Sequence, residues 1–190
     1  MQKLKERIMG EGRVIGDDTI LKVDTFLNHQ IDPQFTMEMG KELASRFSGE
    51  GVTRVLTVEA SGIAVALATA LALGVPVVFA KKGRASTQNA GTYSAQVYSF
   101  TRGESVGIFV SSRFLGPEDT VLIVDDFLAH GEALSGMAEI VDQSGARLAG
   151  AGIVIEKLFQ GGGSKLRERG VRIESLAAIS SMSEEHIEFL

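Results

Sequence analysis

Residues 121–134, with the sequence VLIVDDFLAHGEAL, constrain the fold of this chain more than any other segment. The four consecutive aliphatic residues 121–124 are typical of a strand buried on both faces of a sheet. Because charged side chains are costly to bury, we expect Asp125 and Asp126 to mark the carboxyl end of that strand. Gly131 permits a tight turn, and a helix that starts just after it would aim unpaired N–H groups at the turn. The pattern therefore predicts a ligand site at this edge of an α/β sheet. A phosphate fits the turn, and sugar hydroxyls or a metal fit beside the two acids.

The same segment resembles the signature of type I phosphoribosyltransferases, in which an apolar strand, two aspartates and a five-residue loop bind phosphoribosyl diphosphate (PRPP). The resemblance implies that Asp125 and Asp126 are the catalytic pair that holds the ribose hydroxyls. It also implies that the following loop, here called the phosphate loop, binds the 5-phosphate of PRPP through Ala129, His130, Gly131, Glu132 and Ala133. His130 and Glu132 depart from the usual loop sequence. We therefore expect backbone N–H groups to hold the phosphate while these two side chains point outward.

Other nucleotide-binding motifs also place acids or glycines next to an apolar strand. A P-loop requires the spacing G-x-x-x-x-G-K-[ST], which residues 161–165, GGGSK, do not supply. A dinucleotide fingerprint requires a third glycine, which the run starting at Gly150 lacks. A surface-exposed turn without a ligand remains the alternative for residues 125–126. The strand, acids, glycine and helix nevertheless follow one another in the order that a sugar-phosphate site requires.

Composition limits the class of protein. The chain has 190 residues, of which 44% are hydrophobic and 23% charged, which predicts a single α/β domain. It contains no cysteine and its three histidines lack metal-ligand spacing, so we expect no metal site built by the protein. The net charge of -5 argues against a nucleic-acid partner. Charged residues 2–7 argue against a secretory signal, and glycines and a proline interrupt the apolar region 60–78, so we expect a cytoplasmic protein without a membrane span.

Helical and strand patterns alternate along most of the chain. We expect helices at residues 1–9, 33–48, 63–73 and 133–144, strands at 52–58, 75–79, 121–124, 148–155 and 171–176, a hairpin at 93–100 and 106–111, and an alternating segment at 21–26. This order predicts an α/β fold with a mainly parallel sheet flanked by helices, as in type I phosphoribosyltransferases. We expect residues 1–190 to form one phosphoribosyltransferase domain, in which residues 1–36 and 158–190 build a small hood over the active site.

A second turn from strand to helix follows the strand at 52–58. Small residues there allow backbone N–H groups to face an anion, and in the family this position is occupied by the pyrophosphate-binding loop. The resemblance therefore assigns this role to Glu59, Ala60, Ser61 and Gly62. Ala60 stands where the xanthine-specific branch favours a serine, so the expected contact at that position is through the backbone alone. An ordinary turn is the alternative interpretation.

Cations follow the strand at 75–79. Lys81, Lys82 and Arg84 would neutralise the charge of pyrophosphate, although a solvated charge run is the alternative. In related enzymes such segments reach phosphates in the neighbouring subunit, which implies a homodimer.

Residues 21–33, LKVDTFLNHQIDP, closely resemble the amino-terminal hood of xanthine phosphoribosyltransferases, and the resemblance extends over nearly the whole chain. It implies that Leu21 packs on the base and that Asn28 and Lys157 form hydrogen bonds with it. Lys157 ends the strand at 148–155, where an ammonium group can donate to O6 and N7 of a 6-oxopurine. An asparagine amide can donate to the 2-carbonyl, which xanthine has and hypoxanthine lacks. For Asn28, a plain turn residue is the alternative.

The resemblance implies a purine phosphoribosyltransferase of salvage metabolism, which converts xanthine and PRPP to xanthosine 5'-monophosphate and pyrophosphate. It further implies Mg²⁺ bound through PRPP or pyrophosphate, and substitution at the ribose C1 through an oxocarbenium-like state. Hypoxanthine and guanine are the alternative bases. A non-catalytic PRPP-sensing regulator of the same fold is a further alternative. Such a regulator would need a DNA-binding segment or a basic face, for which the length and charge of this chain leave no room.

Overall fold

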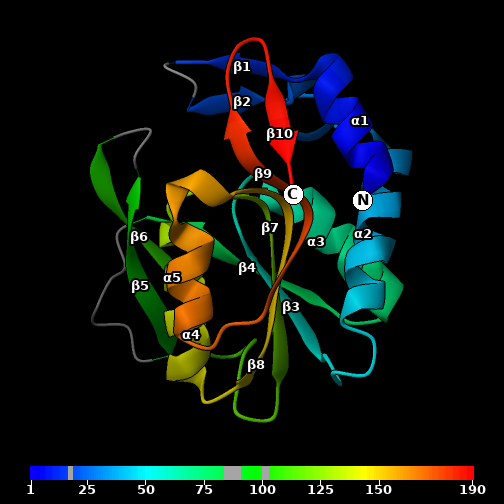
Figure 1. The fold of residues 1–190 in the computed structure, drawn as a ribbon. Helices are drawn as coiled ribbons and strands as arrows, with labels where there is room; N and C mark the ends of the chain where they lie inside the picture. Colours follow the sequence, from blue (N-terminus) through cyan, green and yellow to red (C-terminus); the bar gives the residue numbers. More distant parts are fainter. Residues whose placement is uncertain (17–18, 84–90, 100–102) are drawn as a thin grey trace.

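The computed structural model describes residues 1–16, 19–83, 91–99 and 103–190. Their main feature is an eight-stranded sheet with the strand order β10-β9-β8-β7-β3-β4-β6-β5 (Figure 1). The strands of this sheet are β3 (Arg54–Val58), β4 (Val77–Lys82), β5 (Thr92–Ser99), β6 (Glu104–Ser111), β7 (Thr120–Leu128), β8 (Arg147–Lys157), β9 (Ile173–Met182) and β10 (Ile187–Phe189). The five strands β9, β8, β7, β3 and β4 are parallel, whereas β10, β6 and β5 pair antiparallel at the two edges.

Helices cover both faces of the sheet. On one face, α1 (Gln2–Glu11), α2 (Pro33–Arg46) and α3 (Gly62–Leu73) contribute to one apolar cluster, and on the other α4 (Glu132–Ser144) and α5 (Gly162–Glu168) contribute to a second. Side chains of β7 alternate between these clusters: Leu122 and Val124 belong to the first, and Val121 and Ile123 to the second. This arrangement confirms the predicted mainly parallel α/β sheet flanked by helices.

The strand at the centre of the prediction is longer than expected. β7 continues through both aspartates to Leu128, and its ladder with β8 pairs Asp125 with Ile153 and Leu128 with Glu156. Asp125 and Asp126 are each only 6% exposed, so the expectation that the acids end the strand because they cannot be buried was wrong. The strand can extend because β8 supplies hydrogen-bond partners on one side after the pairing with β3 has ended at Ile123 on the other.

The amino-terminal part gathers at one end of the molecule with β10 (Figure 1). β1 (Arg13–Ile15) and β2 (Ile20–Lys22) form an antiparallel hairpin, followed by a π-helical segment, η1 (Asp24–Asn28). The alternation at residues 21–26 therefore predicted an extended segment where only its first part is a strand. At the other end of the chain, β9 pairs with β8, so residues 173–182 of the predicted hood belong to the central sheet.

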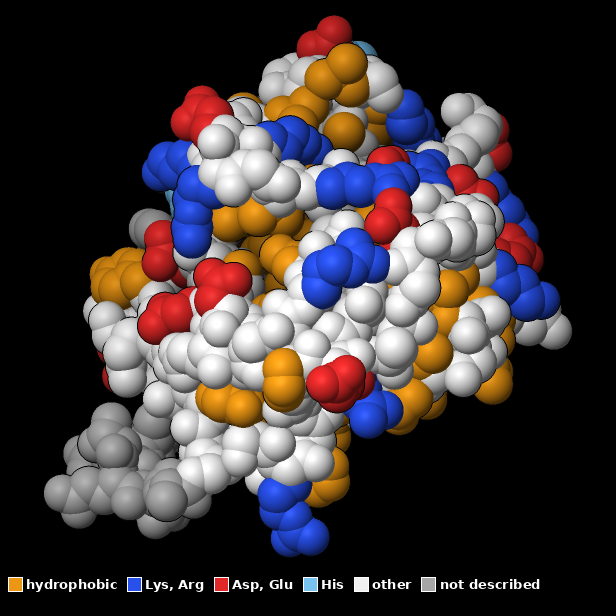
Figure 2. Space-filling model, turned by 90° about the horizontal axis from the view of Figure 1, so that it is seen from below, with side chains coloured by type: hydrophobic (Ala, Val, Ile, Leu, Met, Phe, Trp, Pro, Cys, Tyr) orange, Lys and Arg blue, Asp and Glu red, His pale blue; other side chains and the backbone are white. Residues whose placement is uncertain are grey.

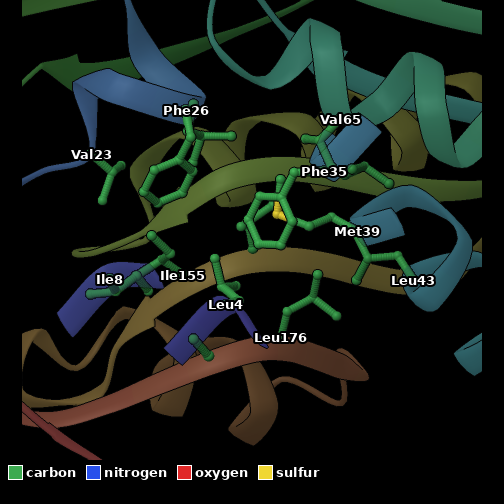
Figure 3. Packing of buried hydrophobic residues seen from close by; sticks show 14 of the residues in the cluster. Leu4, Ile8, Val23, Phe26, Phe35, Met39, Leu43, Val65, Ile155 and Leu176 are labelled. Atoms are coloured by element: carbon green, nitrogen blue, oxygen red, sulfur yellow. The ribbon is translucent and has the colours of Figure 1, made fainter. Parts of the chain in front are cut away.

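Aromatic and aliphatic packing attaches this region to the domain (Figure 3). The ring of Phe26 in η1 meets the ring of Phe35 in α2 edge to face, with centroids 5.8 Å apart. The guanidinium of Arg7 in α1 lies 4.7 Å and 4.8 Å from the two ring centroids and also pairs with Asp32, which caps α2. η1 is consequently held from both sides, which fixes where its last residue, Asn28, lies.

The surface seen from below in Figure 2 carries interspersed basic and acidic side chains. None of the described helices combines the length and the apolar composition that crossing a membrane requires.

Candidate active site

The two aspartates follow the part of β7 that pairs with β3. The last β3–β7 pair in register is Leu56 with Ile123, so Asp125 and Asp126 lie beside the turn that leaves β3. The backbone N–H of Asp126 donates to Oδ1 of Asp125 at 3.0 Å. Two adjacent carboxyl groups are thus held at the carboxyl ends of the parallel strands, the edge at which α/β sheets bind ligands.

Burial and charge act together on Asp125. Burial raises the pKa of Asp125 well above its usual range, and the neighbouring Asp126 raises it further by its charge and a side-chain hydrogen bond. The charge of Lys82 at the end of β4 acts in the opposite direction. A cation or a hydrogen-bond donor close to these acids would therefore stabilise the ionised form of Asp125, which burial and the charge of Asp126 disfavour.

The predicted pyrophosphate loop, residues 59–62, fits closely against Asp125. A side chain at Gly62, the first residue of α3, would place its Cβ 2.5 Å from Oδ1 of Asp125 and 2.4 Å from Oγ1 of Thr57. Glycine is therefore required for the acid to approach the start of α3. Glu59 accepts a hydrogen bond from the backbone N–H of Lys82 at 2.6 Å, which ties this loop to the end of β4, and the Glu59–Ala60 peptide bond is cis. Ala60 is exposed and Ser61 is half-buried.

Thr57 was not predicted as part of the site. Its side chain is fully buried, and its hydroxyl has no hydrogen-bond partner among the described residues although it lies next to Asp125 and Gly62. A single threonine inside an apolar strand gives no signal in the sequence that would have indicated this position.

The phosphate loop connects β7 to α4 as predicted. Gly131 has a φ of 87° and caps α4, and its carbonyl accepts from Ser135 N at 2.8 Å. Such a φ is rare for residues other than glycine, which explains the glycine at this position. Glu132 begins the helix with an exposed side chain, in agreement with its expected outward orientation, whereas His130 is half-buried. The loop therefore presents the start of a 13-residue helix beside the acids, where phosphates are commonly bound.

The residues predicted to bind the base already have partners within the chain. The Nζ of Lys157 at the end of β8 donates to the Thr19 carbonyl at 2.7 Å and lies 5.5 Å from the centre of the Phe127 ring. Burial lowers the pKa of Lys157. Nδ2 of Asn28 donates to Oδ2 of Asp126 at 3.0 Å, which joins the hood directly to the aspartate pair.

Three further residues were predicted at this edge. Leu21 is 5% exposed and packs within the apolar cluster that contains α1 and α2. Lys81 lines a groove between β4 and β6 together with Phe79 and Phe114. Arg84 lies outside the described residues.

α5 lies in the segment that we expected to belong to the hood over the active site, but its contact with the phosphate loop was not predicted. Gly162 at its start donates its N–H to the Ala129 carbonyl at 3.1 Å and so contacts the phosphate loop directly. Three consecutive glycines at 161–163 are the signal for this contact in the sequence, although their spacing matches only part of a P-loop.

Within the described ranges, no cluster of three or more histidine, cysteine, aspartate or glutamate side chains could hold a metal ion. A divalent cation at the two adjacent acids would therefore need further ligands from a substrate and from water, as Mg²⁺ commonly has in phosphate-binding sites.

Comparison with known proteins links this geometry to one family. The pattern of the phosphoribosyl transferase domain matches residues 30–180. A xanthine phosphoribosyltransferase of Heliobacterium modesticaldum is 69% identical over 189 residues, covering 100% of both chains, and one of Moorella thermoacetica is 58% identical over 190 residues, covering 100% of this chain and 96% of that protein. The crystal structure of adenine phosphoribosyltransferase from Thermoanaerobacter pseudethanolicus superimposes with a TM-score of 0.73 at 25% identity, covering 92% of this chain and 99% of that one.

Proposed function

Because the chain belongs to the phosphoribosyltransferase family, we propose that it transfers the phosphoribosyl group of PRPP to xanthine, giving xanthosine 5'-monophosphate and pyrophosphate. Full-length similarity to proteins with this activity supports the choice of base. The observation that carries the proposal is the hydrogen bond between Asn28 and Asp126. It brings the side chain expected to read the 2-position of the base to the carboxyl group expected to hold the ribose.

Each part of PRPP has a proposed partner along the same edge. The phosphate loop, residues 129–133, holds the 5-phosphate through backbone N–H groups at the start of α4. Asp125 and Asp126 accept hydrogen bonds from the ribose hydroxyls. Residues 59–62 cradle the pyrophosphate at the start of α3, with Lys82 beside them.

Catalysis by this arrangement would be mainly positional and electrostatic. The bond from C1 to pyrophosphate breaks as the base nitrogen attacks, and positive charge develops on the ribose in between. The carboxyl pair of β7 would face the ribose hydroxyls, and its negative charge, which a bound cation favours by opposing the raised pKa of Asp125, would stabilise that developing cation. Lys157 orients the base through its 6-carbonyl, and Asn28 through its 2-carbonyl.

We propose that Mg²⁺ accompanies PRPP. Asp125 and Asp126 lie next to each other and are each 6% exposed, which raises the pKa of Asp125, and a cation would stabilise the ionised form of such a pair. When bound, the ion neutralises the charge that accumulates on the leaving pyrophosphate. Asp125 and Asp126 are the residues that would lie nearest to it.

We also propose a homodimer that works in the cytoplasm. Leu67 and Leu71, one helical turn apart on α3, are 61% and 67% exposed, and Phe79 and Phe114 are 41% and 58% exposed. Such exposed apolar side chains are typical of an interface. The groove of about 490 Å³ between β4 and β6 also contains Lys81, so a partner docked there would receive this cation.

Lys81 and Lys82 are neighbours at the end of β4, so their side chains point to opposite faces of the sheet and can have different roles. The charge of Lys82 acts on Asp125 of its own chain, whereas Lys81 lines the apolar groove on the other side. We therefore assign Lys82 to its own active site and Lys81 to that of the partner.

The decisive experiment is a kinetic comparison of purified protein with PRPP, Mg²⁺ and each of xanthine, hypoxanthine and guanine, with products separated by chromatography. We expect the highest kcat/KM for xanthine. As a control, Asp126→Asn keeps the shape of the side chain but should lower kcat/KM for PRPP by roughly tenfold to a thousandfold, or about 1.4–4 kcal/mol. A clear preference for hypoxanthine or guanine would reject xanthine as the substrate, and unchanged kinetics of folded Asp126→Asn would reject the site.

A further inference from the structure

We propose that α5 is a brace for the phosphate loop, and that Gly162 and Arg167 are positioning residues for binding of the 5-phosphate. The inference rests on the proposed function insofar as residues 129–133 hold that phosphate. It assigns a role to residues 161–169, which lie outside the signature in β7 and for which the expected hood gave no contact with the phosphate loop.

The start of α5 lies directly against the phosphate loop. A Cβ on Gly162 would lie 2.4 Å from the Ala129 carbonyl oxygen, 2.4 Å from the His130 carbonyl carbon and 2.5 Å from the Gly131 nitrogen. These neighbours are backbone atoms, which cannot rotate away as a side chain can. Any larger residue at position 162 must therefore displace the phosphate loop or α5 itself.

A hydrogen bond from α5 also orients one carbonyl group of the phosphate loop. The Gly162 N–H donates to the carbonyl of Ala129, so this oxygen of the phosphate loop is engaged on the side of α5. The carbonyl of one residue and the N–H of the next belong to the same planar trans peptide group and therefore point in opposite directions. Fixing the carbonyl of Ala129 thus fixes the orientation of the N–H that follows it, at the position where an anion would bind.

Further contacts continue the brace along α4. Leu166, 2% exposed, would lie 3.2 Å from a Cβ on Gly131, and Arg169 donates to the Ser135 hydroxyl at 3.1 Å. The short helix therefore contacts the phosphate loop and the first turn of the helix behind it (Figure 1).

An ion pair attaches the brace to the sheet. Arg167 donates to Glu156 of β8 through both terminal guanidinium nitrogens, Nη1 and Nη2, with Nη2 2.8 Å from Oε2, and Ser175 of β9 also donates to this carboxyl group. Glu156 is 1% exposed, and Gly163 leaves space for the pair because a Cβ there would lie 2.6 Å from Arg167 Nη1. Since Glu156 precedes Lys157, the phosphate loop is connected to the strand that carries the base-binding lysine.

The brace predicts a selective effect on phosphate binding. We would titrate the wild-type protein and Gly162→Ala with ribose 5-phosphate and, separately, with pyrophosphate by calorimetry. We expect Gly162→Ala to raise the Kd for ribose 5-phosphate by about tenfold or more, equivalent to about 1.4 kcal/mol, and to change the Kd for pyrophosphate by less than about twofold. Arg167→Met should also raise the Kd for ribose 5-phosphate. Arg167→Lys, which keeps a cation for Glu156, should restore part of the affinity.

Gly40→Ala is the matched control. A Cβ on Gly40 in α2 would lie 2.5 Å from the backbone of Ala68 in α3, a clash as severe as that at Gly162 but away from the phosphate loop. We expect this variant to lower the Tm without changing the Kd for ribose 5-phosphate. An equal loss of affinity in Gly40→Ala would overturn the brace, because the effect would then reflect general destabilisation.

Two further outcomes separate the brace from the proposed function. Normal ribose 5-phosphate binding by folded Gly162→Ala overturns the brace and leaves the proposed function intact. If Gly162→Ala does not fold, Arg167→Met gives the same decision, because it retains Gly162 and Gly163 and removes only the ion pair with Glu156: normal ribose 5-phosphate binding by folded Arg167→Met overturns the brace. A wild-type protein that binds neither ribose 5-phosphate nor PRPP overturns the proposed function and the brace with it.

Discussion

Replacement of Asn28 by alanine should change activity in two separable ways. The first is common to every base, because Asn28→Ala removes a hydrogen bond to Asp126 at 3.0 Å. Asn28 itself is exposed, so we place the loss at the lower end of the range for hydrogen bonds, about 1 kcal/mol or roughly fivefold in kcat/KM. The second is specific to xanthine, whose 2-carbonyl loses its donor. A donor buried against a ligand contributes about 1–3 kcal/mol, so xanthine should lose a further factor of roughly 5 to 150.

The assay is kcat/KM for xanthine and for hypoxanthine, measured at saturating PRPP for the wild type, Asn28→Ala and Gln30→Ala. Gln30 is the matched control because its amide donates within the same region, to the Thr25 carbonyl at 3.1 Å, and not to the aspartates. We expect Gln30→Ala to leave the ratio of the two bases unchanged. Introducing Asp126→Ala into the wild type and into Asn28→Ala completes a double-mutant cycle. In the Asp126→Ala background, Asn28→Ala should no longer cause the loss of kcat/KM that is common to both bases, but it should still cause the loss that is specific to xanthine. An equal reduction for both bases in Asn28→Ala would refute the reasoning that this amide reads the 2-position.

Four other predictions address the same site and its supports. Lys157→Ala should lower kcat/KM for xanthine, hypoxanthine and guanine by similar factors, measured in the same assay, whereas a loss confined to one base would contradict its role at the shared 6-carbonyl. Because the pKa of Asp125 is raised on folding, the protonated acid contributes stability at low pH that is lost as the pH rises through the folded pKa. The Tm of inactive Asp125→Asn should therefore increasingly exceed that of the wild type as the pH is raised, and a constant difference would contradict this. Burial alone would raise the pKa of Glu156, but hydrogen bonds from Arg167 and Ser175 and the charge of Arg167 lower it, so the stability it contributes is lost as the pH falls through the folded pKa. Arg167→Met should cost less than the about 3–5 kcal/mol of a fully buried pair, because the Arg167 side chain is 38% exposed, and denaturant titration should show the cost shrinking in acid. Leu71→Asp should shift light scattering from a dimer to a monomer, and an unchanged dimer would place the interface elsewhere.

The sequence predicted the elements whose signals are local. The aliphatic run before the aspartates defines β7, and helix-spaced apolar residues such as Met39, Leu43 and Phe47 indicated α2, which ends at Arg46. Glycine before Glu132 correctly indicated where α4 begins, because the required left-handed φ is a property of one residue. The order of these elements sufficed for the parallel sheet, since parallel strands joined by helices have few alternative arrangements.

Features that depend on contacts across the chain were not predictable. The burial of Asp125 depends on its pairing with Ile153 of β8 and on the close approach of Gly62 at the start of α3, which only the assembled fold defines. The π-helical conformation of residues 24–28 depends on packing of Phe26 against α2 and Arg7, whereas the local pattern favoured an extended segment. The role of α5 depends on backbone contacts 31–33 positions from the phosphate loop, and the glycine triplet alone did not identify its partner.

The side chains proposed to bind substrate also hold the protein together. Asn28 joins the hood to Asp126, and Lys157 joins the end of β8 to Thr19. Each donor group nevertheless has more hydrogens than these contacts use, since an amide nitrogen carries two and an ammonium group three. The contacts can therefore orient the donors while leaving a hydrogen available for the base, and loss of either side chain will combine a structural effect with a binding effect. The structural effect of a substitution cancels only when two ligands are compared with the same variant, either two bases or ribose 5-phosphate and pyrophosphate. The difference that remains between the two ligands is the effect on binding.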